Sequence, residues 1–322
     1  MFYPSLVALA YAAVAYGTCM PGRSHQGPLP PATDEERALA AELRADVDAL
    51  AAEGERNVPR PATMERAVTK LDLALRAAGL APKRHDFAAA GAFGANLDAE
   101  VAGARGGREV VVVGAHYDSV PGAPGADDDA SGIAAALAIA RRFARKPGGR
   151  ALRVVLFANE EAPYFGTDAH GSLVYARECA ARGDAIVAML SLETMGWFAD
   201  APGSQRYPWP FGALYPDRGD FIGFVGDLGS RGLVRDAVGT FRQTTPFPAE
   251  GAALPRFVPG VGWSDHWSFW QIGVPAVMVT DTAPFRNPHY HEPSDRPETL
   301  DYDRLARVTL GVERVVRHLT DG

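Results

Sequence analysis

The sequence contains only two cysteines, Cys19 and Cys179, among its 322 residues. Two cysteines cannot build a disulfide framework or a zinc site made of thiolates. Any bound metal must therefore be held by histidine and carboxylate side chains. Basic residues are also in the minority, because 32 Lys and Arg stand against 39 Asp and Glu and the net charge is −7. This balance lacks the electrostatic footprint of proteins that bind phosphate backbones, so we do not expect a nucleic-acid partner.

The apolar run at the amino terminus is too short to cross a membrane. Residues Leu6 to Gly17 have the length of a signal-peptide core. No Lys or Arg precedes the run, and the residues before Cys19 match a lipoprotein cleavage box poorly. We expect export, with lipidation of Cys19 as one form of it and a plain N-terminal arm as the alternative. Residues 1–33 would then be a signal or anchor segment and linker, and residues 34–322 the catalytic domain.

Strand and helix patterns alternate along the rest of the chain, whose 47% apolar content is enough for a substantial core. This alternation predicts a single α/β domain with a mostly parallel central sheet flanked by helices. Residues 197–215 break the pattern with two tryptophans and several prolines, and we interpret them as an insertion over the site. The expected strands are 83–88, 96–101, 109–113, 153–158, 185–192, 221–225 and 276–279, and the expected helices are two within 34–79 and others at 130–143, 169–181 and 303–319.

Acidic residues and histidines follow the predicted buried strands directly. His116 and Asp118 follow the first of these, Glu160 and Glu161 follow the second, and Glu193 follows the third. Ligands gather at the carboxyl ends of the strands in such a sheet. Crowded carboxylates repel one another and are tolerated mainly when a cation binds them. We therefore predict a metal site at this edge of the sheet.

The segment PGADDDASG places three consecutive aspartates in a Gly-rich turn ahead of a helix. Capping the helix would need only one of the three. If His116 and Asp128 bind metal, Asp127 and Asp129 can support the ligands or cap the helix. Nitrogen and oxygen ligands without sulfur suit zinc, and carboxylates that can bridge suit a pair of ions.

Several motifs together resemble metallopeptidase family 28, the co-catalytic zinc exopeptidases that include bacterial leucyl aminopeptidase. They are GAHYDS, PGADDDASG, the NEE motif, and SDHWSFWQIGVPAVMVTDT followed by NPHYHEPSD and LDY. The resemblance covers roughly residues 110–302. It implies an aminopeptidase that acts on peptides with two zinc ions per chain. It also implies the metal ligands, with one zinc held by His116 and Glu193, the other by Glu161 and His291, and Asp128 bridging both.

The same resemblance implies the catalytic residues. Glu160 corresponds to the general base, Asp118 to the carboxylate that orients the first histidine ligand, and Tyr290 to a residue that stabilises the oxyanion in some members. Glu193 departs from the commonest pattern, because many members have aspartate there. His289 is expected to be a neighbour of the site rather than a ligand. His170 and His266 are candidates for substrate contact, although a structural role is the favoured interpretation.

Two other functions remain open at this stage. A glutaminyl-peptide cyclotransferase has the same fold and much of the same ligand set. Its site, however, corresponds chiefly to a version that holds one zinc ion. A non-catalytic receptor-like domain would have lost ligands, and the complete ligand set with Glu160 argues against it. No H-E-x-x-H helix or G-x-S-x-G elbow indicates another hydrolase. We expect no stable protein partner, and membrane attachment only through the N-terminal segment.

Overall fold

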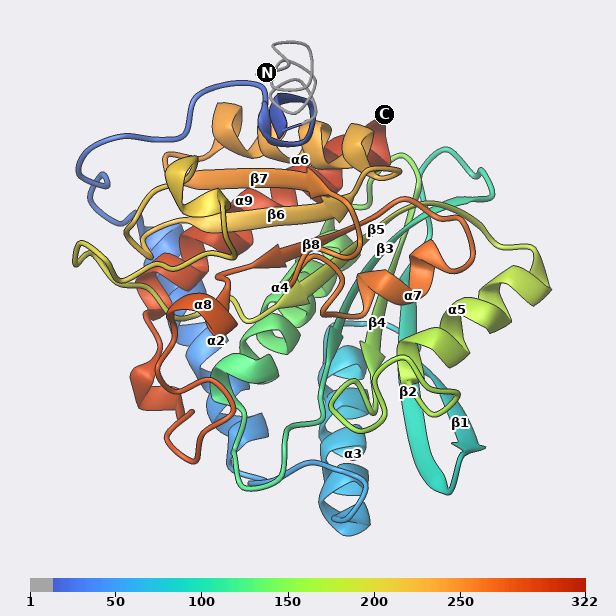
Figure 1. Ribbon diagram of the computed structural model, residues 1–322. Helices are drawn as coiled ribbons and strands as arrows, with labels where there is room; N and C mark the ends of the chain where they lie inside the picture. The colour runs from blue at the N-terminus through green and yellow to red at the C-terminus, as the bar shows by residue number, and fades with distance from the viewer. Residues whose placement is uncertain (1–13) are drawn as a thin grey trace, which may run out of the picture.

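The fold is built on one eight-stranded sheet (Figure 1). The computed structural model describes residues 14–322, and the strand order is β1-β2-β4-β3-β5-β8-β6-β7. The four central strands β4, β3, β5 and β8 are parallel, whereas β2 and β6 run antiparallel to their central neighbours. This confirms the prediction of an α/β domain with a mostly parallel sheet. The strands are β1 Lys83–Ala89, β2 Ala92–Val101, β3 Glu109–His116, β4 Ala151–Phe157, β5 Ala185–Glu193, β6 Ile222–Asp227, β7 Ala249–Leu254 and β8 Ala276–Thr280.

Helices cover both faces of the sheet, as expected for parallel strands that are apolar on both sides. Helices α2, α3, α4, α6 and α9 pack on one face, while α5 and α7 pack on the other (Figure 1). Helix α2 begins with a capping box, in which Thr33 and Glu36 exchange side-chain and backbone hydrogen bonds. The helices are α2 Asp34–Ala51, α3 Pro61–Ala77, α4 Gly132–Arg145, α5 Gly171–Arg182, α6 Arg231–Thr244, α7 His266–Trp270, α8 Ala283–Arg286 and α9 Tyr302–Asp321.

Strand β3 extends beyond Gly114, where the sequence predicted its end. A Cβ atom at Gly114 would lie 2.3 Å from the ring of Phe157, so glycine lets this ring pack against the strand. The glycine thus serves packing inside the strand and does not end it. His116 is consequently the last residue of β3, held in the regular sheet rather than in a loop.

Helix α6 and strand β7 were not predicted from the sequence. The strand has the sequence AEGAAL, which contains no β-branched residue and therefore carries a weak strand signal. It forms one edge of the sheet through a parallel pairing with β6. The chain before α2 passes beside α6 and β7 (Figure 1, dark blue).

The predicted leader core Leu6–Gly17 lies mostly outside the described residues. Residues 14–18 are helical, and residues 19–33 have no regular secondary structure. Among the helices of residues 14–322, none combines the length and the apolar character that a membrane crossing requires.

The predicted insertion forms a loop that returns to its starting point. Ala199 and Gly219 pair as an isolated bridge at its base. The rings of Tyr207 and Tyr215 stack 5.6 Å apart, and the Tyr215 hydroxyl donates to the carbonyl of Gly251 in β7 at 2.9 Å. The insertion is therefore attached to the edge strand.

Candidate metal centre

The predicted ligands meet at the carboxyl ends of the central strands. His116 and Glu193 are the last residues of β3 and β5, and Glu160 and Glu161 come shortly after β4. Left-handed backbone conformations are concentrated beside these residues, a feature that costs energy outside glycine and recurs at functional sites. The non-glycine residues with positive φ in this region are Asn159, Thr194, Thr282 and His291.

Asp128 lies between the two predicted histidine ligands. Its Oδ1 is 3.2 Å from His116 Nε2, and its Oδ2 is 3.1 Å from His291 Nε2. Glu193 Oε2 is 3.5 Å from the same His116 nitrogen, while Glu161 Oε2 is 3.5 Å from the same His291 nitrogen. The five side chains therefore form two groups that share one aspartate.

Buried polar atoms without partners mark this centre as a place for cations. His116 Nε2, Asp128 Oδ1 and Glu161 Oε1 are buried, and none has a hydrogen-bond partner in the described part of the chain. Such atoms carry a desolvation cost that is normally offset by a bound group. Imidazole nitrogen and carboxylate oxygen are ligands that suit zinc, so the residues present fit this metal.

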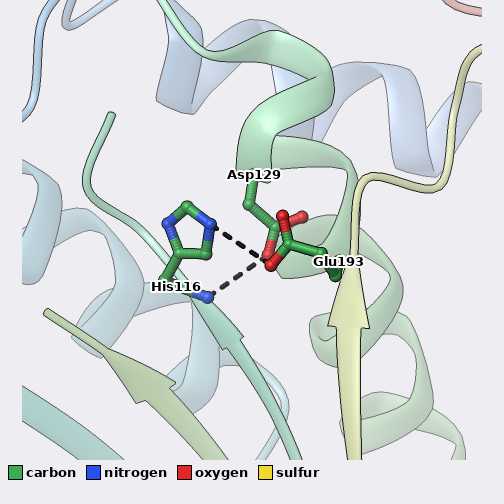
Figure 2. A group of neighbouring side chains, drawn as sticks. All are labelled: His116, Asp129 and Glu193. Carbon is green, nitrogen blue, oxygen red and sulfur yellow. Dashed lines mark hydrogen bonds and ion pairs between the residues drawn. The ribbon is translucent and has the colours of Figure 1, made fainter. Parts of the chain in front are cut away.

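Asp129 also lies beside His116 and Glu193, as Figure 2 shows. Its carboxylate, however, accepts three backbone N–H groups, from His116 at 3.2 Å, Gly132 at 3.1 Å and Thr194 at 3.1 Å. These bonds connect β3, α4 and the end of β5. Asp129 therefore holds the surrounding backbone in place, whereas the carboxylate of the neighbouring Asp128 faces His116 and His291.

Asp118 links the first histidine to the two glutamates. His116 Nδ1 is 3.2 Å from the Asp118 carbonyl and 3.5 Å from its carboxylate. The same carboxylate accepts the backbone N–H groups of Glu160 and Glu161, both at 3.1 Å. The carbonyl and the carboxylate of Asp118 thus both face the histidine ring, and the carboxylate also fixes the loop that carries both glutamates.

Several supporting residues of the centre were missed in the sequence. Arg56 is fully buried, and its guanidinium donates to the carbonyls of Tyr117 at 2.7 Å and Gly125 at 3.0 Å, at the two ends of the loop that joins His116 to Asp128. Asp295 accepts the backbone N–H groups of Asp127 and Asp128 at 2.8 and 3.1 Å. Arg56 stands in a loop without a local pattern, and Asp295 ends the motif NPHYHEPSD, but only the fold reveals these contacts.

Ser264 supports the ligand Glu193 in the same way. Its hydroxyl donates to Glu193 Oε2 at 2.7 Å and lies 2.8 Å from the hydroxyl of Ser191. Ser264 begins the motif SDHWSFWQIGVPAVMVTDT, but only its position beside Glu193 in the fold reveals this supporting role.

The crowded charges at the centre shift the pKa values of its side chains. Burial is the largest influence on the pKa of Glu160 and raises it well above its ordinary value, and the carboxylates of Glu193 and Glu161 raise it further against the opposing effect of His116. Burial would by itself lower the pKa of His116, but the surrounding carboxylates outweigh burial and raise it. Such a site favours an added positive charge.

Tyr290 and the three remaining histidines each contact partners of their own. The ring of Tyr290 stacks on that of His291 at 3.8 Å. His289 Nδ1 is 2.9 Å from the Ser294 hydroxyl, His170 Nε2 is 3.2 Å from Asp265, and His266 Nε2 is 2.8 Å from the Val261 carbonyl. These three histidines have partners outside the two ligand groups.

An apolar cavity of about 110 Å³ lies beside the centre. Glu193 and Tyr290 line it together with residues of β8, β6 and β7, so the cavity extends from the metal ligands to the edge of the sheet. Tyr207, Phe211 and Tyr215 of the insertion form a further wall. The predicted aromatic insertion therefore does border the site.

A mostly parallel sheet with His and carboxylate groups gathered at its carboxyl edge places the chain among α/β proteins with a ligand site at the strand ends, and these groups could hold a metal ion. Within this class, the profile of Peptidase family M28 matches residues 96–316. The chain belongs to this family, which confirms the resemblance found in the sequence and identifies a peptidase-type hydrolase.

The chain matches only part of the length of its curated relatives. The chain is 39% identical over 212 residues to the uncharacterized protein YfbL of Escherichia coli, with 63% of this chain and 65% of the relative covered. It is 28% identical over 227 residues to a probable leucine aminopeptidase of Arthroderma otae, covering 64% of this chain and 53% of the relative. The matched segment thus spans less than two thirds of either relative.

Solved structures share the fold at low identity. LapB from Legionella pneumophila has a TM-score of 0.71 at 18% identity, covering 98% of this chain and 81% of its own. Porphyromonas gingivalis glutaminyl cyclase has a TM-score of 0.66 at 20% identity, covering 87% and 98%. BSAP, a zinc aminopeptidase from Bacillus subtilis, has a TM-score of 0.57 at 21% identity, covering 72% and 52%.

Proposed function

We propose that the protein is an aminopeptidase that uses two zinc ions to hydrolyse the N-terminal peptide bond of peptides. The observation that carries the proposal is the position of Asp128, whose two oxygens face His116 and His291 at 3.2 and 3.1 Å. A carboxylate so placed is suited to bridging two cations. The names of the leucine aminopeptidase relative and of the zinc aminopeptidase with the same fold support this choice.

Each residue of the centre has a role in this proposal. His116 and Glu193 would hold one zinc, Glu161 and His291 the other, and Asp128 both. Bound zinc would supply Lewis-acid chemistry, acidifying a water and stabilising negative charge on the carbonyl oxygen. Asp118 keeps the His116 ring oriented through its contacts with Nδ1.

Glu160 is the proposed general base. Its Oε2 is 4.0 Å from His116 Nε2, and the side chain is buried beside the two ligand groups. The carboxylate takes a proton from the attacking water and later gives it to the amine as the peptide C–N bond breaks. Tyr290 is proposed to donate a hydrogen bond to the oxyanion, since it stacks on His291 and also lines the cavity.

The proposed substrate has a free amino terminus and an apolar first side chain. The surplus of carboxylates at the centre favours a cationic group, and the adjoining cavity is lined mainly by apolar residues. Acetylation of the amino terminus of a good substrate should therefore abolish hydrolysis. Mass spectrometry measures the cleavage of the free and the acetylated peptide. Equal cleavage of the two would contradict the proposal.

A glutaminyl-peptide cyclotransferase is the second candidate, favoured by the fold shared with the Porphyromonas glutaminyl cyclase. The number of bound zinc ions distinguishes the aminopeptidase from the cyclotransferase. We expect dialysis against a chelator to remove activity and two equivalents of zinc per chain to restore it fully. Full activity with one tightly bound zinc, together with cyclisation of N-terminal glutamine, would favour the cyclotransferase.

A further inference from the structure

Strand β7 has two roles, because it forms the edge of the sheet and also lines the apolar cavity. Glu250, Gly251, Ala252 and Leu254 of this strand belong to the cavity lining. An edge strand presents backbone N–H and C=O groups that need a partner or a cover. The shape of the cavity at this end therefore depends on what holds the edge in place.

Residues 16–24, which we call the N-terminal strap, lie against this edge (Figure 1). The hydroxyl of Ser24 accepts the backbone N–H of Ala249 at 3.0 Å. Gly17 approaches so closely that a Cβ atom there would lie 2.5 Å from the carbonyl oxygen of Ala253. Contacts thus occur towards both ends of β7.

Side chains of the strap also reach the face of β7 that packs on α6. The Met20 side chain fills the space beside Gly251, where a Cβ atom would lie 3.0 Å from Met20 Cγ. A Cβ atom at Gly239 of α6 would similarly lie 2.9 Å from the ring of Pro21. Glycine at these two positions therefore makes room for the strap.

Three arginines of α6 hold the backbone of the strap. Arg231 Nε donates to the carbonyl of Tyr16 at 2.6 Å, and its guanidinium lies 3.9 Å from the centre of the Tyr16 ring. Arg235 donates to the carbonyl of Cys19. Hydrogen bonds from charged donors are stronger than those between neutral groups. The strap is therefore bound along its length and not only at one point.

The third arginine, Arg242, joins the strap to the cavity wall. It donates to the carbonyl of Pro21 at 3.2 Å, to the carbonyl of Ala249 at 2.7 Å, and to the carboxylate of Glu250 at 3.0 Å. The Arg242 side chain is only 8% exposed, so this connection is shielded from solvent. One guanidinium thus ties the strap, the edge strand and a residue that lines the cavity.

We propose that the N-terminal strap belongs to the catalytic domain, rather than to the leader and linker predicted for residues 1–33, and determines which substrate side chains the cavity accepts. This inference rests on the proposed aminopeptidase function. Displacing the strap leaves the edge of β7 without its cover and lets the far wall of the cavity shift. Large apolar side chains, which reach that wall, then lose contacts, whereas small ones do not. His116 and Glu193 end β3 and β5, which β8 and β6 separate from β7, so these two proposed ligands stay in place.

The test displaces the strap in the full-length chain. The double variant Gly17→Val and Ser24→Ala introduces a clash with Ala253 and removes the bond to Ala249. Arg23→Ala is the matched control, because Arg23 is exposed and makes no hydrogen bond or ion pair within residues 14–322. Kinetics are measured with leucine, phenylalanine and alanine p-nitroanilides, and bound zinc is measured in parallel.

We expect the double variant to raise KM for the leucine and phenylalanine substrates by about tenfold, with kcat, zinc content and the alanine substrate little changed. An unchanged leucine-to-alanine ratio of kcat/KM, with only a lower melting temperature, would overturn the role in specificity. If the double variant fails to fold, Met20→Ala provides the same comparison. Failure of the unmodified protein to hydrolyse any of the three substrates would instead reject the aminopeptidase function itself.

Discussion

Asp128 and Asp129 are adjacent in the chain and have opposite environments. The carboxylate of Asp129 is surrounded by backbone N–H groups, whereas Asp128 faces two histidines and has one oxygen without a hydrogen-bond partner among residues 14–322. Glu160 and Glu161 form a similar pair, because Glu161 lies 3.5 Å from His291 and Glu160 lies 4.0 Å from His116. Successive residues at the end of a strand point in different directions and can therefore take separate roles.

This difference predicts distinct consequences for two adjacent substitutions. Glu160→Gln keeps the size of the side chain but cannot accept a proton, so turnover should fall by roughly two to four orders of magnitude with normal zinc content. Glu161→Gln replaces an anionic ligand with a neutral amide, so zinc should be bound more weakly. Glu292→Gln, an exposed position next to His291, is the control. Zinc loss in Glu160→Gln with retention in Glu161→Gln would mean that the two roles are exchanged.

Arg56 is a buried cation that contacts carbonyl groups. Burial lowers the pKa of this arginine to about 10 and the aspartates around it oppose that shift, so it stays charged at neutral pH. Replacing it with methionine leaves buried carbonyls without donors, at about 1–3 kcal/mol each. We expect Arg56→Met to lower the free energy of unfolding by about 3 kcal/mol or more and to weaken zinc binding. Urea unfolding and metal titration test this, with exposed Arg60→Met as the control. Wild-type stability in Arg56→Met would contradict it.

At the scale of elements, helix α9 closes the core by packing against α2, α4 and α6. Gly311 is a point of close approach, because a Cβ atom there would lie 2.2 Å from the ring of Phe241 in α6. Small residues at such crossings allow two helices to approach, and any added volume must displace a neighbour.

Gly311→Ala should therefore destabilise the protein although alanine is the better helix former. We expect a loss of about 1–3 kcal/mol in the free energy of unfolding from overpacking. Gly232→Ala in α6 is the matched control, since no atom of the described residues lies within 4 Å of a Cβ atom there. Its effect should be neutral or stabilising by up to about 1 kcal/mol. Urea unfolding measures both, and equal stability of the two variants would show that the α6–α9 contact has room for a methyl group.

At the scale of the whole molecule, the sheet separates two apolar cores, and the metal centre lies at the strand ends between them. His266 lies on the side of the sheet that holds the smaller apolar core. Its Nε2 contacts the Val261 carbonyl, and its ring packs edge-on against Trp270 with the ring centres 4.6 Å apart. Burial lowers the pKa of His266 from 6.5 to about 4. The folded protein therefore keeps this ring neutral under conditions where the unfolded chain protonates it.

Acid should consequently destabilise the fold through His266. Between pH 6.5 and about 4 the unfolded state binds a proton that the folded state does not, so stability falls as the pH falls through this window. We expect this contribution to reach about 3 kcal/mol and to be absent in His266→Gln. Urea unfolding of both proteins at several pH values, with chelator present so that metal release is equal, measures it. Parallel pH profiles of the two proteins would contradict the prediction.

Local sequence patterns are sufficient to predict the central strands and the residues that follow them. Valine-rich runs predict buried strands from local pattern alone, and parallel strands must bring their carboxyl ends to one edge. These two rules place four site residues at the same edge of the sheet, namely His116, Glu160, Glu161 and Glu193. Asp128 was considered as a ligand from its place in the PGADDDASG turn, and the resemblance to a family assigned the ligand roles of Asp128 and His291, whose loops have no periodic pattern of their own.

The elements that complete the site become apparent from long-range contacts in the fold. Strand β7 has a weak local signal and is held as a strand by β6, α6 and the N-terminal strap. Arg56 acts through partners more than 60 residues away. The distinction between Asp128 and Asp129 depends on backbone groups from three separate elements. These features arise from contacts between distant segments. Sequence patterns miss them because such patterns report only on residues that are neighbours along the chain.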